Sequence, residues 1–196
     1  MEVRELVTRI VDGILGGGRH EPASRPEEGG AAPEMSHDPA PAPGTVTIAI
    51  GADHGGFPLK ERIGFKLREA GYGVLDCGTD SHEPVDYPDF AHAVARKVID
   101  GEAAWGIVVD GAGIGSAIAA NKVPGIRAAA CYDISTARNS REHNHANVLT
   151  LGAGLTGDGL AWQIVEEWLA VQWGGGRHAR RVDKITAVEQ TYTRRP

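Results

Sequence analysis

A glycine-rich turn that follows a carboxylate is the segment of this chain best suited to chemistry. Asp110-Gly-Ala-Gly-Ile-Gly-Ser116 comes directly after the apolar run Trp105–Val109 and leads into a helical pattern. Such a turn directs several backbone N–H groups at one point, where the helix dipole also favours negative charge. It can bind an anion or stabilise a developing oxyanion, with Asp110 as the proton acceptor. The same glycine pattern also suits dinucleotide binding or a merely structural turn.

Polar residues also flank two other apolar runs. Asp53-His54 follow the first run, and His143-Asn-His145 precede the last. Each has a structural alternative, because Asp53 could cap the next helix and His143 could be a surface residue at a helix end. Ligands of parallel sheets bind at the carboxyl ends of the strands. We therefore expect these residues and Asp110 to share one sheet edge, which favours a functional site.

A basic cluster precedes the last helical pattern and consists of Arg177, His178, Arg180 and Arg181. A solvated helix face is the ordinary explanation for such a cluster. Arginines beside a helix N-terminus also suit a phosphate group, which they can bind with two hydrogen bonds each.

Strand and helix patterns alternate through the C-terminal three quarters of the chain, which predicts an α/β fold. We expect a five-stranded parallel sheet that is covered by helices on both faces. The expected strands are 45–51, 73–76, 104–110, 126–132 and 147–152. The expected helices are 58–70, 89–100, one from about 114, 135–143, 158–173 and 178–193. A single sequence does not fix the order of the strands in the sheet.

Composition narrows the functional class. The 196 residues carry a formal charge of −6 and are 41% hydrophobic, which suits one globular domain and argues against nucleic acid as a partner. Cys77 and Cys131 match no metal-ligand spacing and are expected to be reduced thiols. No apolar run is long enough to cross a membrane. We expect a cytoplasmic protein with no membrane contact and no bound metal.

The N-terminal part differs in composition from the rest. Residues 1–16 place apolar side chains at three- and four-residue steps and predict a short amphipathic helix. Residues 17–44 are rich in Pro, Gly and Ala and predict a disordered linker, so that the globular domain covers 45–196. Glu2, Glu5 and Asp12 disfavour a mitochondrial presequence. The helix could mediate oligomerisation or pack on its own domain, and Met35 is a conceivable alternative start.

Several motifs give the chain a resemblance to a known family. They are Ile50-Gly-Ala-Asp-His-Gly-Gly56, Asp86-Tyr-Pro-Asp89, Gly113-Ile-Gly115, Ala119-Ala-Asn-Lys-Val-Pro-Gly-Ile-Arg127, Arg141-Glu-His-Asn144, Asn147-Val-Leu149, and Gly175-Gly-Arg-His178 with Arg181. In this order they resemble the ribose-5-phosphate isomerase B and galactose-6-phosphate isomerase family over residues 45–193. The resemblance implies a Rossmann-like three-layer sandwich, α/β in class. It also implies a homodimer or dimer of dimers with shared active sites, and no cofactor or metal. It implies proton transfer between C1 and C2 of a sugar phosphate through a cis-enediolate.

The resemblance also implies roles for individual residues. Asp53 and His54 would bind the sugar, His143 would open the furanose ring, and Asn144 would hold the enediolate. Tyr87 would contact the substrate. The remaining implied residues are the anion hole of Gly111, Ala112, Gly113 and Gly115 and the phosphate grip of Arg177, His178 and Arg181.

The chain departs from the family at its catalytic centre. Many relatives have a cysteine base where this chain has Asp110, and others use a glutamate where it has Ser116. A hydroxyl residue is replaced by Ala112, an arginine by Gly154, and an aspartate by His145. Asp110 is therefore the predicted replacement base.

Three functional hypotheses follow from these features. The first is an isomerase of ribose 5-phosphate and ribulose 5-phosphate, with Asp110, His143, Asp53 and His54 as the catalytic residues. The second is an isomerase of a tetrose or hexose phosphate, suggested by Gly154 and His145. The third is a catalytically silent sugar-phosphate-binding scaffold. The N-terminal segment resembles the encapsulation peptides of bacterial microcompartment enzymes, so residues 3–15 are expected to dock on a shell protein and place the enzyme in the compartment lumen.

Overall fold

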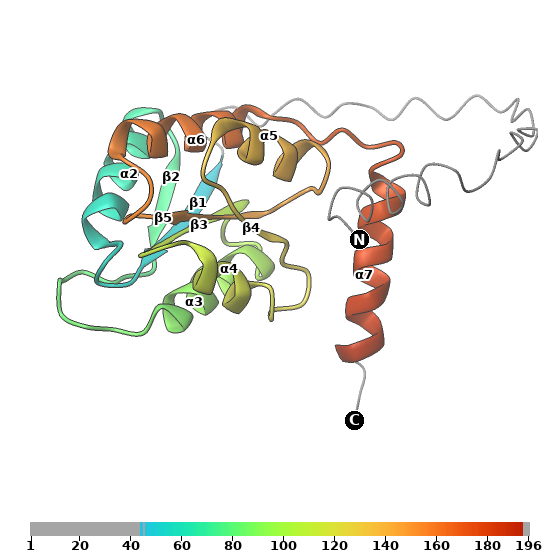
Figure 1. Ribbon diagram of the computed structural model, residues 1–196, viewed down its shortest axis with the longest axis horizontal. Helices are drawn as coiled ribbons and strands as arrows, with labels where there is room; N and C mark the ends of the chain where they lie inside the picture. The colour runs from blue at the N-terminus through green and yellow to red at the C-terminus, as the bar shows by residue number, and fades with distance from the viewer. Residues whose placement is uncertain (1–43, 45, 194–196) are drawn as a thin grey trace, which may run out of the picture. The chain divides into compact units, whose positions relative to one another are not determined.

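Five parallel strands form the centre of the molecule in the computed structural model, which describes residue 44 and residues 46–193 (Figure 1). The strands are β1 (Thr47–Ala52), β2 (Gly73–Asp76), β3 (Trp105–Asp110), β4 (Ala128–Ala130) and β5 (Val148–Gly152). Their order in the sheet is β2-β1-β3-β5-β4, and every neighbouring pair is parallel. The chain moves outward from β1 to β2 and then returns to place β3 on the other side of β1. The crevice between the carboxyl ends of β1 and β3 is therefore the position where this class of sheet binds ligands.

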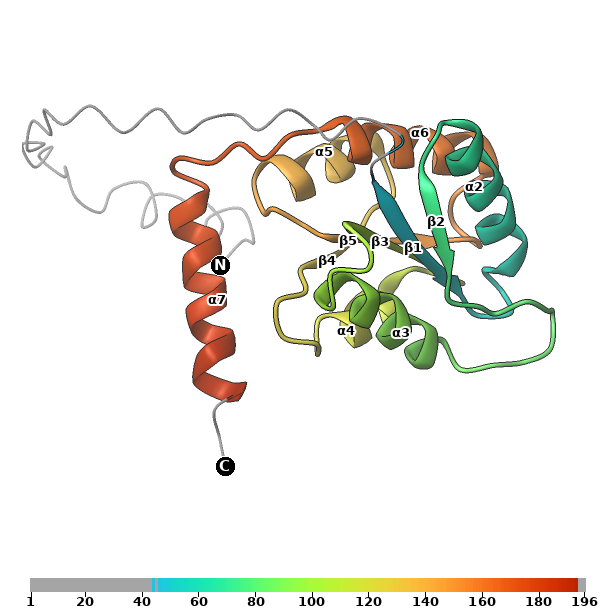
Figure 2. The same cartoon turned by 180° about the vertical axis from the view of Figure 1, so that it is seen from behind.

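Helices cover both faces of the sheet, because its central strands are apolar on both sides (Figures 1 and 2). One face carries α2 (Phe57–Glu69), α5 (Ile134–Glu142) and α6 (Asp158–Ala170), and the other carries α3 (Tyr87–Ile99) and α4 (Ile114–Ala120). Alternate side chains of β3 pack against the helices on opposite faces of the sheet. Ile107 and Val109 belong to the buried cluster that includes α2 and α6, whereas Val108 belongs to the cluster that includes α3. The last helix, α7, spans Ala179–Thr193.

The α/β class and the five-stranded parallel sheet are confirmed, and the differences lie at the ends of elements. The strand expected over 126–132 is reduced to Ala128–Ala130, the three residues that pair with β5. The helix expected over 158–173 ends at Ala170, because Val171 already has an extended backbone. The expected amphipathic helix at 1–16 and the linker at 17–44 lie outside the described residues, apart from residue 44. No helix in the described part of the chain is long and apolar enough to cross a membrane.

Candidate active site

The glycine turn after β3 is fixed on two sides. Gly113 has a φ of +79°, a left-handed conformation that favours glycine, and it is the residue that precedes α4. A Cβ atom at Gly113 would lie 3.0 Å from the backbone carbon of Leu151 in β5. From the same strand, the hydroxyl group of Thr150 donates a hydrogen bond of 2.6 Å to the Gly113 carbonyl. The turn therefore packs closely against β5 and is joined to it by the Thr150 hydroxyl group.

Asp110 turns its carboxylate back onto this turn. The carboxylate accepts hydrogen bonds from the backbone amides of Ala112 at 2.8 Å, of Gly113, and of Ser116 at 2.9 Å. The residue is 4% exposed. Two of the amides expected to form the anion hole, those of Ala112 and Gly113, thus serve Asp110. Elsewhere in this turn, the amides of Ile114 and Gly115 have no acceptor among the described residues.

Asp53 lies beside Asp110 at the carboxyl end of β1. Ala52 and Val109 are paired in the register of β1 and β3, and the Asp53 amide donates to the Val109 carbonyl at 3.2 Å. Neighbouring strands are about 4.8 Å apart, so the two aspartates follow the sheet at matching positions. Oδ1 of Asp53 accepts the Gly56 amide at 2.8 Å, just before α2. No described group donates to its Oδ2, which leaves one carboxylate oxygen open at this edge.

His54 and Tyr87 border the same edge. Nδ1 of His54 lies 3.2 Å from the amide nitrogen of Val85, and when it accepts that hydrogen bond the proton of a neutral ring is on Nε2. Tyr87 begins α3, and its ring covers Gly115. A Cβ atom at Gly115 would lie 2.6 Å from Cζ of that ring, so the approach of Tyr87 to the turn depends on glycine.

A second cluster forms where α5 ends and α7 begins. The ring of His143 stacks on that of His178, with centroids 4.2 Å apart and planes 4° from parallel. The Gly174 amide donates to the Glu142 carbonyl at 3.0 Å, which joins the two segments. Nδ2 of Asn144 donates to the carbonyl of Asn139 at 3.2 Å. The structure thus brings His143 and Asn144 together with the start of the basic segment.

This second cluster lies at the opposite edge of the sheet, and the expectation of one shared edge was wrong. Helix α5 runs from the carboxyl end of β4 back to the start of β5, so the residues after it lie at the amino ends of the strands. Arg141 illustrates this position, because its guanidinium carbon lies 4.7 Å from the ring of Trp105, the first residue of β3. Residues that precede a parallel strand lie opposite those that follow one. Six residues of β3, about 20 Å at about 3.3 Å per residue, separate the two edges.

Positive charge accumulates at the amino edge. Arg141 is buried between Trp105 and Trp168, and desolvation together with the charge of Arg127 lowers its pKa to about 10. Desolvation also lowers the pKa of His145, followed by the charges of Arg127 and Arg141.

His178 is under the same influence. Desolvation and then the charges of His143, Arg177 and Arg181 lower its pKa. Its Nε2 accepts a hydrogen bond of 3.3 Å from Nε of Arg177, and its buried Nδ1 has no partner in the described structure. An anion bound here would relieve the repulsion among these cations.

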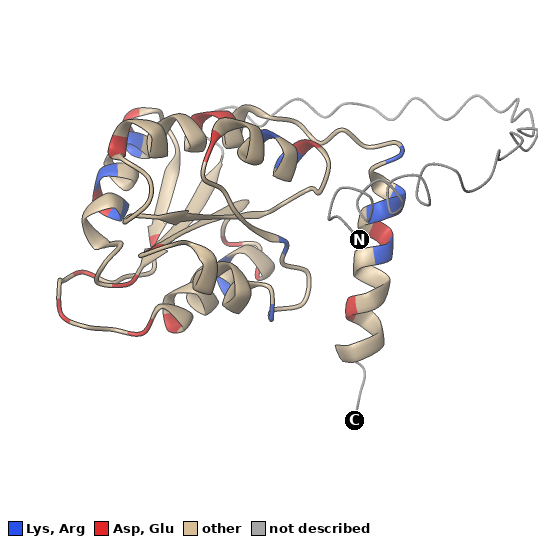
Figure 3. Cartoon of the chain, in the orientation of Figure 1, with Lys and Arg blue, Asp and Glu red and all other residues tan. Residues whose placement is uncertain are grey.

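Acidic and basic side chains are concentrated in different segments of the described domain. Figure 3 shows Asp and Glu along the loop between β2 and α3, near the carboxyl edge, and Arg at the start of α7. The acidic positions of that loop and its flanks are Asp76, Asp80, Glu83, Asp86 and Asp89. An anionic group would therefore fit the α7 end, and carboxylates that could accept a proton lie at the other edge.

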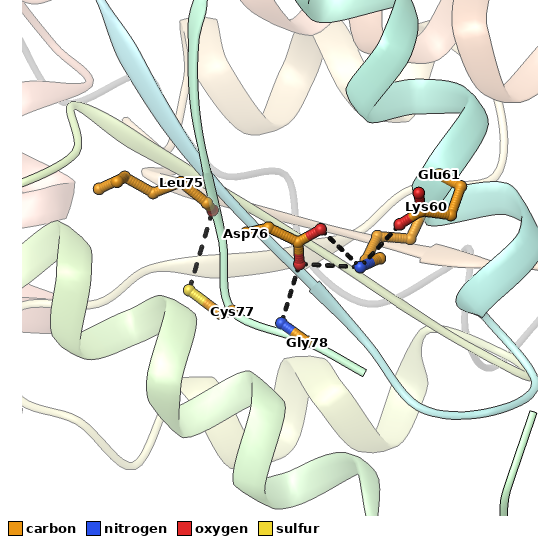
Figure 4. A network of polar contacts seen from close by, with 6 residues as sticks. All are labelled: Lys60, Glu61, Leu75, Asp76, Cys77 and Gly78. Carbon is orange, nitrogen blue, oxygen red and sulfur yellow. Dashed lines mark hydrogen bonds and ion pairs between the residues drawn. The ribbon is translucent and has the colours of Figure 1, made fainter. Parts of the chain in front are cut away.

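A buried lysine beside the carboxyl edge was not foreseen from the sequence. Lys60 is 1% exposed, and its Nζ contacts both carboxylate oxygens of Asp76 at 2.8 and 2.7 Å and Oε1 of Glu61 at 2.9 Å (Figure 4). Asp76 also accepts the Gly78 amide at 2.9 Å. A hollow of about 710 Å³ opens over this network. Because carboxylates surround the ammonium group, it fastens α2 to the end of β2 and is a poor phosphate ligand. The sequence could have indicated this burial, because Lys60 lies next to Leu59 and Ile63 on the apolar face of α2.

Known proteins resemble this chain over the described domain. A family model described as Ribose/Galactose Isomerase matches residues 48–185. Ribose-5-phosphate isomerase B of Escherichia coli (strain K12) is 50% identical over 143 residues, which cover 73% of this chain and 96% of that protein. D-erythrulose-4-phosphate isomerase of Pectobacterium atrosepticum is 42% identical over 142 residues, or 71% of this chain and 93% of that protein. The structure of Clostridium thermocellum ribose-5-phosphate isomerase B superposes with a TM-score of 0.74 at 53% identity, covering 74% of this chain and 99% of that structure.

Proposed function

The chain belongs to the ribose/galactose isomerase family, whose members named above are sugar-phosphate isomerases, and on that premise we propose that it interconverts ribose 5-phosphate and ribulose 5-phosphate. The observation that carries the proposal is the division of the predicted site between two sheet edges. One edge offers carboxylates and free backbone amides, and the other offers a cationic cluster. An aldose–ketose isomerisation of a phosphate ester needs both.

Two copies of the chain are needed to unite these half-sites. We define the carboxyl half-site as Asp53, His54, Tyr87, Asp110 and Gly111–Gly115, and the amino half-site as His143, Asn144, Arg177, His178 and Arg181. Five carbons and a phosphate, joined by bonds of about 1.5 Å, extend over less than half of the roughly 20 Å between the edges of one sheet. In a homodimer the carboxyl half-site of one copy would face the amino half-site of its partner.

Exposed apolar side chains beside each half-site support such a dimer. Ile114 and Ile118 of α4 are 52% and 58% exposed, next to the glycine turn. Ile185 and Val188 of α7 are 50% and 60% exposed. Apolar side chains grouped in this way are typical of surfaces that contact another protein. Burial of these helices in one interface would bring α7 of one copy to the turn of the other.

The reaction then follows from the groups available. Arg177, Arg181 and His178 hold the phosphate, and His143 assists the opening of the furanose ring. A carboxylate of the carboxyl half-site takes the proton from C2 of the aldose while the electron pair of the C–H bond forms the C1–C2 double bond of a cis-enediolate. The amides of Ile114 and Gly115 stabilise the oxyanion. Transfer of the O2 hydroxyl proton to O1, formation of the C2 carbonyl and return of the carbon-bound proton to C1 then give the ketose. The base predicted from the sequence is Asp110, and Asp53 is the second carboxylate at this edge.

A phosphorylated tetrose is the second candidate substrate. Gly154 and His145 replace residues that the family often places near the far end of the substrate, and one relative is named as an isomerase of D-erythrulose 4-phosphate. The Gly154 amide donates to the Gly111 carbonyl at 3.0 Å, so this position adjoins the glycine turn. Parallel assays with pentose, tetrose and hexose phosphates would rank the substrates by kcat/KM.

Packaging in a bacterial microcompartment is part of the proposal. The family match begins at residue 48, and the relatives are covered almost completely without the N-terminal segment. Residues 1–44 are thus an addition to the isomerase domain, and residues 3–15 have the apolar spacing of a docking helix. A fluorescent protein fused to residues 1–44 should co-purify with microcompartment shells when the two are produced together. A fusion with Leu6, Ile10 and Ile14 changed to Asp should remain outside them.

Complementation between two inactive variants tests the shared site. Asp53→Asn disables the carboxyl half-site, and His143→Ala disables the amino half-site. Subunits of both variants, mixed and allowed to exchange, should recover about a quarter of the wild-type turnover of ribose 5-phosphate, because half of the dimers are mixed and each holds one intact site. Sites contained within single chains would recover nothing. Absence of turnover by the wild-type protein would contradict the proposed reaction itself.

A further inference from the structure

We propose that Asp53 exchanges the proton with the substrate carbons, and that Asp110 is a positioning residue that holds the glycine turn. This inference rests on the proposed isomerase function and assigns its central step. It follows from the different surroundings of two carboxylates whose residues occupy neighbouring backbone positions at one sheet edge.

The hydrogen bonds of Asp110 are those of a structural carboxylate. Three backbone amides donate to it, and both of its oxygens are engaged. The bonds span the turn from Ala112 to Ser116, so they fix the residues that lead into α4. With 4% of its surface exposed, Asp110 also offers little of itself to a substrate. Its negative charge occupies the position that an oxyanion would otherwise take at these amides.

Asp53 has the features that a proton acceptor needs. It is only partly buried, at the crevice between β1 and β3 where the strand order of the sheet reverses. The Gly56 amide holds Oδ1 at 2.8 Å and so orients the carboxyl group. Oδ2 has no donor among the described residues and keeps its lone pairs for a C–H proton. A carboxylate held by one oxygen and open at the other is both fixed and reactive.

The neighbouring groups suit a reaction at this oxygen. The amides of Ile114 and Gly115, which Asp110 does not use, remain for the oxyanion of the enediolate. Oδ2 of Asp53 would take the C2 proton, the C–H electron pair would become the C1–C2 double bond, and the electrons of the C1 carbonyl bond would move to O1. The hydroxyl proton of O2 would then pass to O1, and the electron pair of the O2–H bond would form the C2 carbonyl bond. The C1–C2 electron pair would take the proton back from the carboxyl group at C1, which regenerates the Asp53 carboxylate. Many relatives have a cysteine base where this chain has Asp110. With Asp110 in that position, Asp53 would take over as the base.

Matched substitutions of the two aspartates separate their roles. Asp53→Asn keeps an oxygen for the Gly56 amide, so the protein should unfold at the wild-type urea concentration while kcat falls by about 10³-fold, the loss typical of a missing general base. Asp53→Glu should recover part of that kcat. Asp110→Asn should lower the urea midpoint, because an NH₂ group in place of Oδ2 cannot accept the hydrogen bond of the Ser116 amide, but reduce kcat only about tenfold. Asp110→Ser keeps a short acceptor that cannot act as a carboxylate base, and it serves if Asp110→Asn does not fold.

Deuterium uptake gives a readout that loss of structure alone does not produce. In D₂O with ribose 5-phosphate, folded Asp53→Asn should incorporate no deuterium at C1 or C2 while it still binds the substrate. Asp110→Ser should incorporate it and keep the wild-type dependence of kcat on pH. Loss of exchange in Asp110→Ser, with only a raised KM in Asp53→Asn, would overturn this inference and leave the proposed function standing. A wild-type protein without turnover or exchange would overturn both.

Discussion

The two edges of the sheet are built by different means. At the carboxyl edge, Asp110 and its three amide donors lie within seven consecutive residues, and Asp53 and Gly56 lie within four. At the amino edge, His143 and His178 come from segments 35 residues apart in sequence and meet by stacking. The first edge is a set of local backbone turns after strands. The second is a gathering of cationic side chains from distant parts of the chain.

This difference assigns the two halves of the chemistry. Backbone amides are fixed in position before a substrate arrives, which suits the stabilisation of charge that appears only in the transition state. Cationic side chains are suited to a charge that the substrate carries throughout, such as a phosphate. The carboxyl edge should therefore govern kcat, and the amino edge should govern mainly KM.

The largest effect should come from removal of the phosphate ligands at the amino edge. Arg177→Ala combined with Arg181→Ala should lower kcat/KM by about 10³-fold, since each charge-assisted hydrogen bond contributes about 2 kcal/mol. Steady-state kinetics should place the loss mainly in KM. Arg180→Ala, on the same exposed helix start, is the matched control and should change kcat/KM less than threefold. An equal loss of kcat/KM in the control would mean that the amino edge attracts the phosphate by its overall positive charge and not by specific hydrogen bonds.

A stability test addresses the lysine network beside the carboxyl edge. Asp76→Asn leaves the buried ammonium group of Lys60 with a weaker set of partners and should lower the free energy of unfolding by about 3 kcal/mol. Lys60→Met removes the buried charge and should cost only about 1 kcal/mol, because Asp76 is partly exposed to water. Urea denaturation measures both values. A larger loss of stability in Lys60→Met than in Asp76→Asn would show that the ion pair does not determine the stability of the contact between α2 and β2.

The contact between Tyr87 and the glycine turn can be tested at Gly115. Gly115→Ala would place a methyl group 2.6 Å from the Tyr87 ring and should destabilise the fold by about 2 kcal/mol, although alanine is the better helix former. Gly111→Ala is the control, because a Cβ atom there meets nothing within 4 Å, and its effect should stay within about 0.5 kcal/mol. Thermal or urea unfolding distinguishes the two. A gain in stability in Gly115→Ala would contradict the ring contact.

The smallest effect concerns pH at the amino edge. The pKa of His145 lies below its ordinary value of 6.5 in the folded protein, so the unfolded chain takes up the proton first as the pH falls. Stability should therefore decrease on acidification from about pH 7.5 to 5.5. His145→Asn, which accepts the φ of +50° at this position, should flatten that decrease in the thermal midpoint. His178 would retain part of the slope, and an unchanged slope in the variant would exclude a contribution from His145.

The sequence was sufficient for the features that depend on local patterns. Continuous apolar runs that alternate with segments of 3.6-residue spacing indicated the α/β class and the parallel sheet, because strands buried on both faces are apolar throughout. The glycine turn after β3 was also readable, since its hydrogen bonds connect residues at most six positions apart. Motifs in the order of the family were sufficient for the likeness to sugar-phosphate isomerases that the comparisons bear out.

Only the tertiary structure decided how the predicted site residues are grouped. His143 precedes a strand whereas Asp110 ends one, so the parallel direction of the strands places them at opposite edges. Only the packing of distant segments brings His178 beside His143. The direction of each side chain also decides which carboxylate is free to accept a proton. Both oxygens of Asp110 accept backbone amides of the glycine turn, whereas one oxygen of Asp53 has no donor among the described residues. The placement of Arg141 between Trp105 and Trp168 follows no spacing in the sequence, because the three residues belong to three separate elements. Local hydrogen bonds and hydrophobic periodicity depend on residues that are close in sequence. The charges that surround a side chain are set only when distant segments pack together.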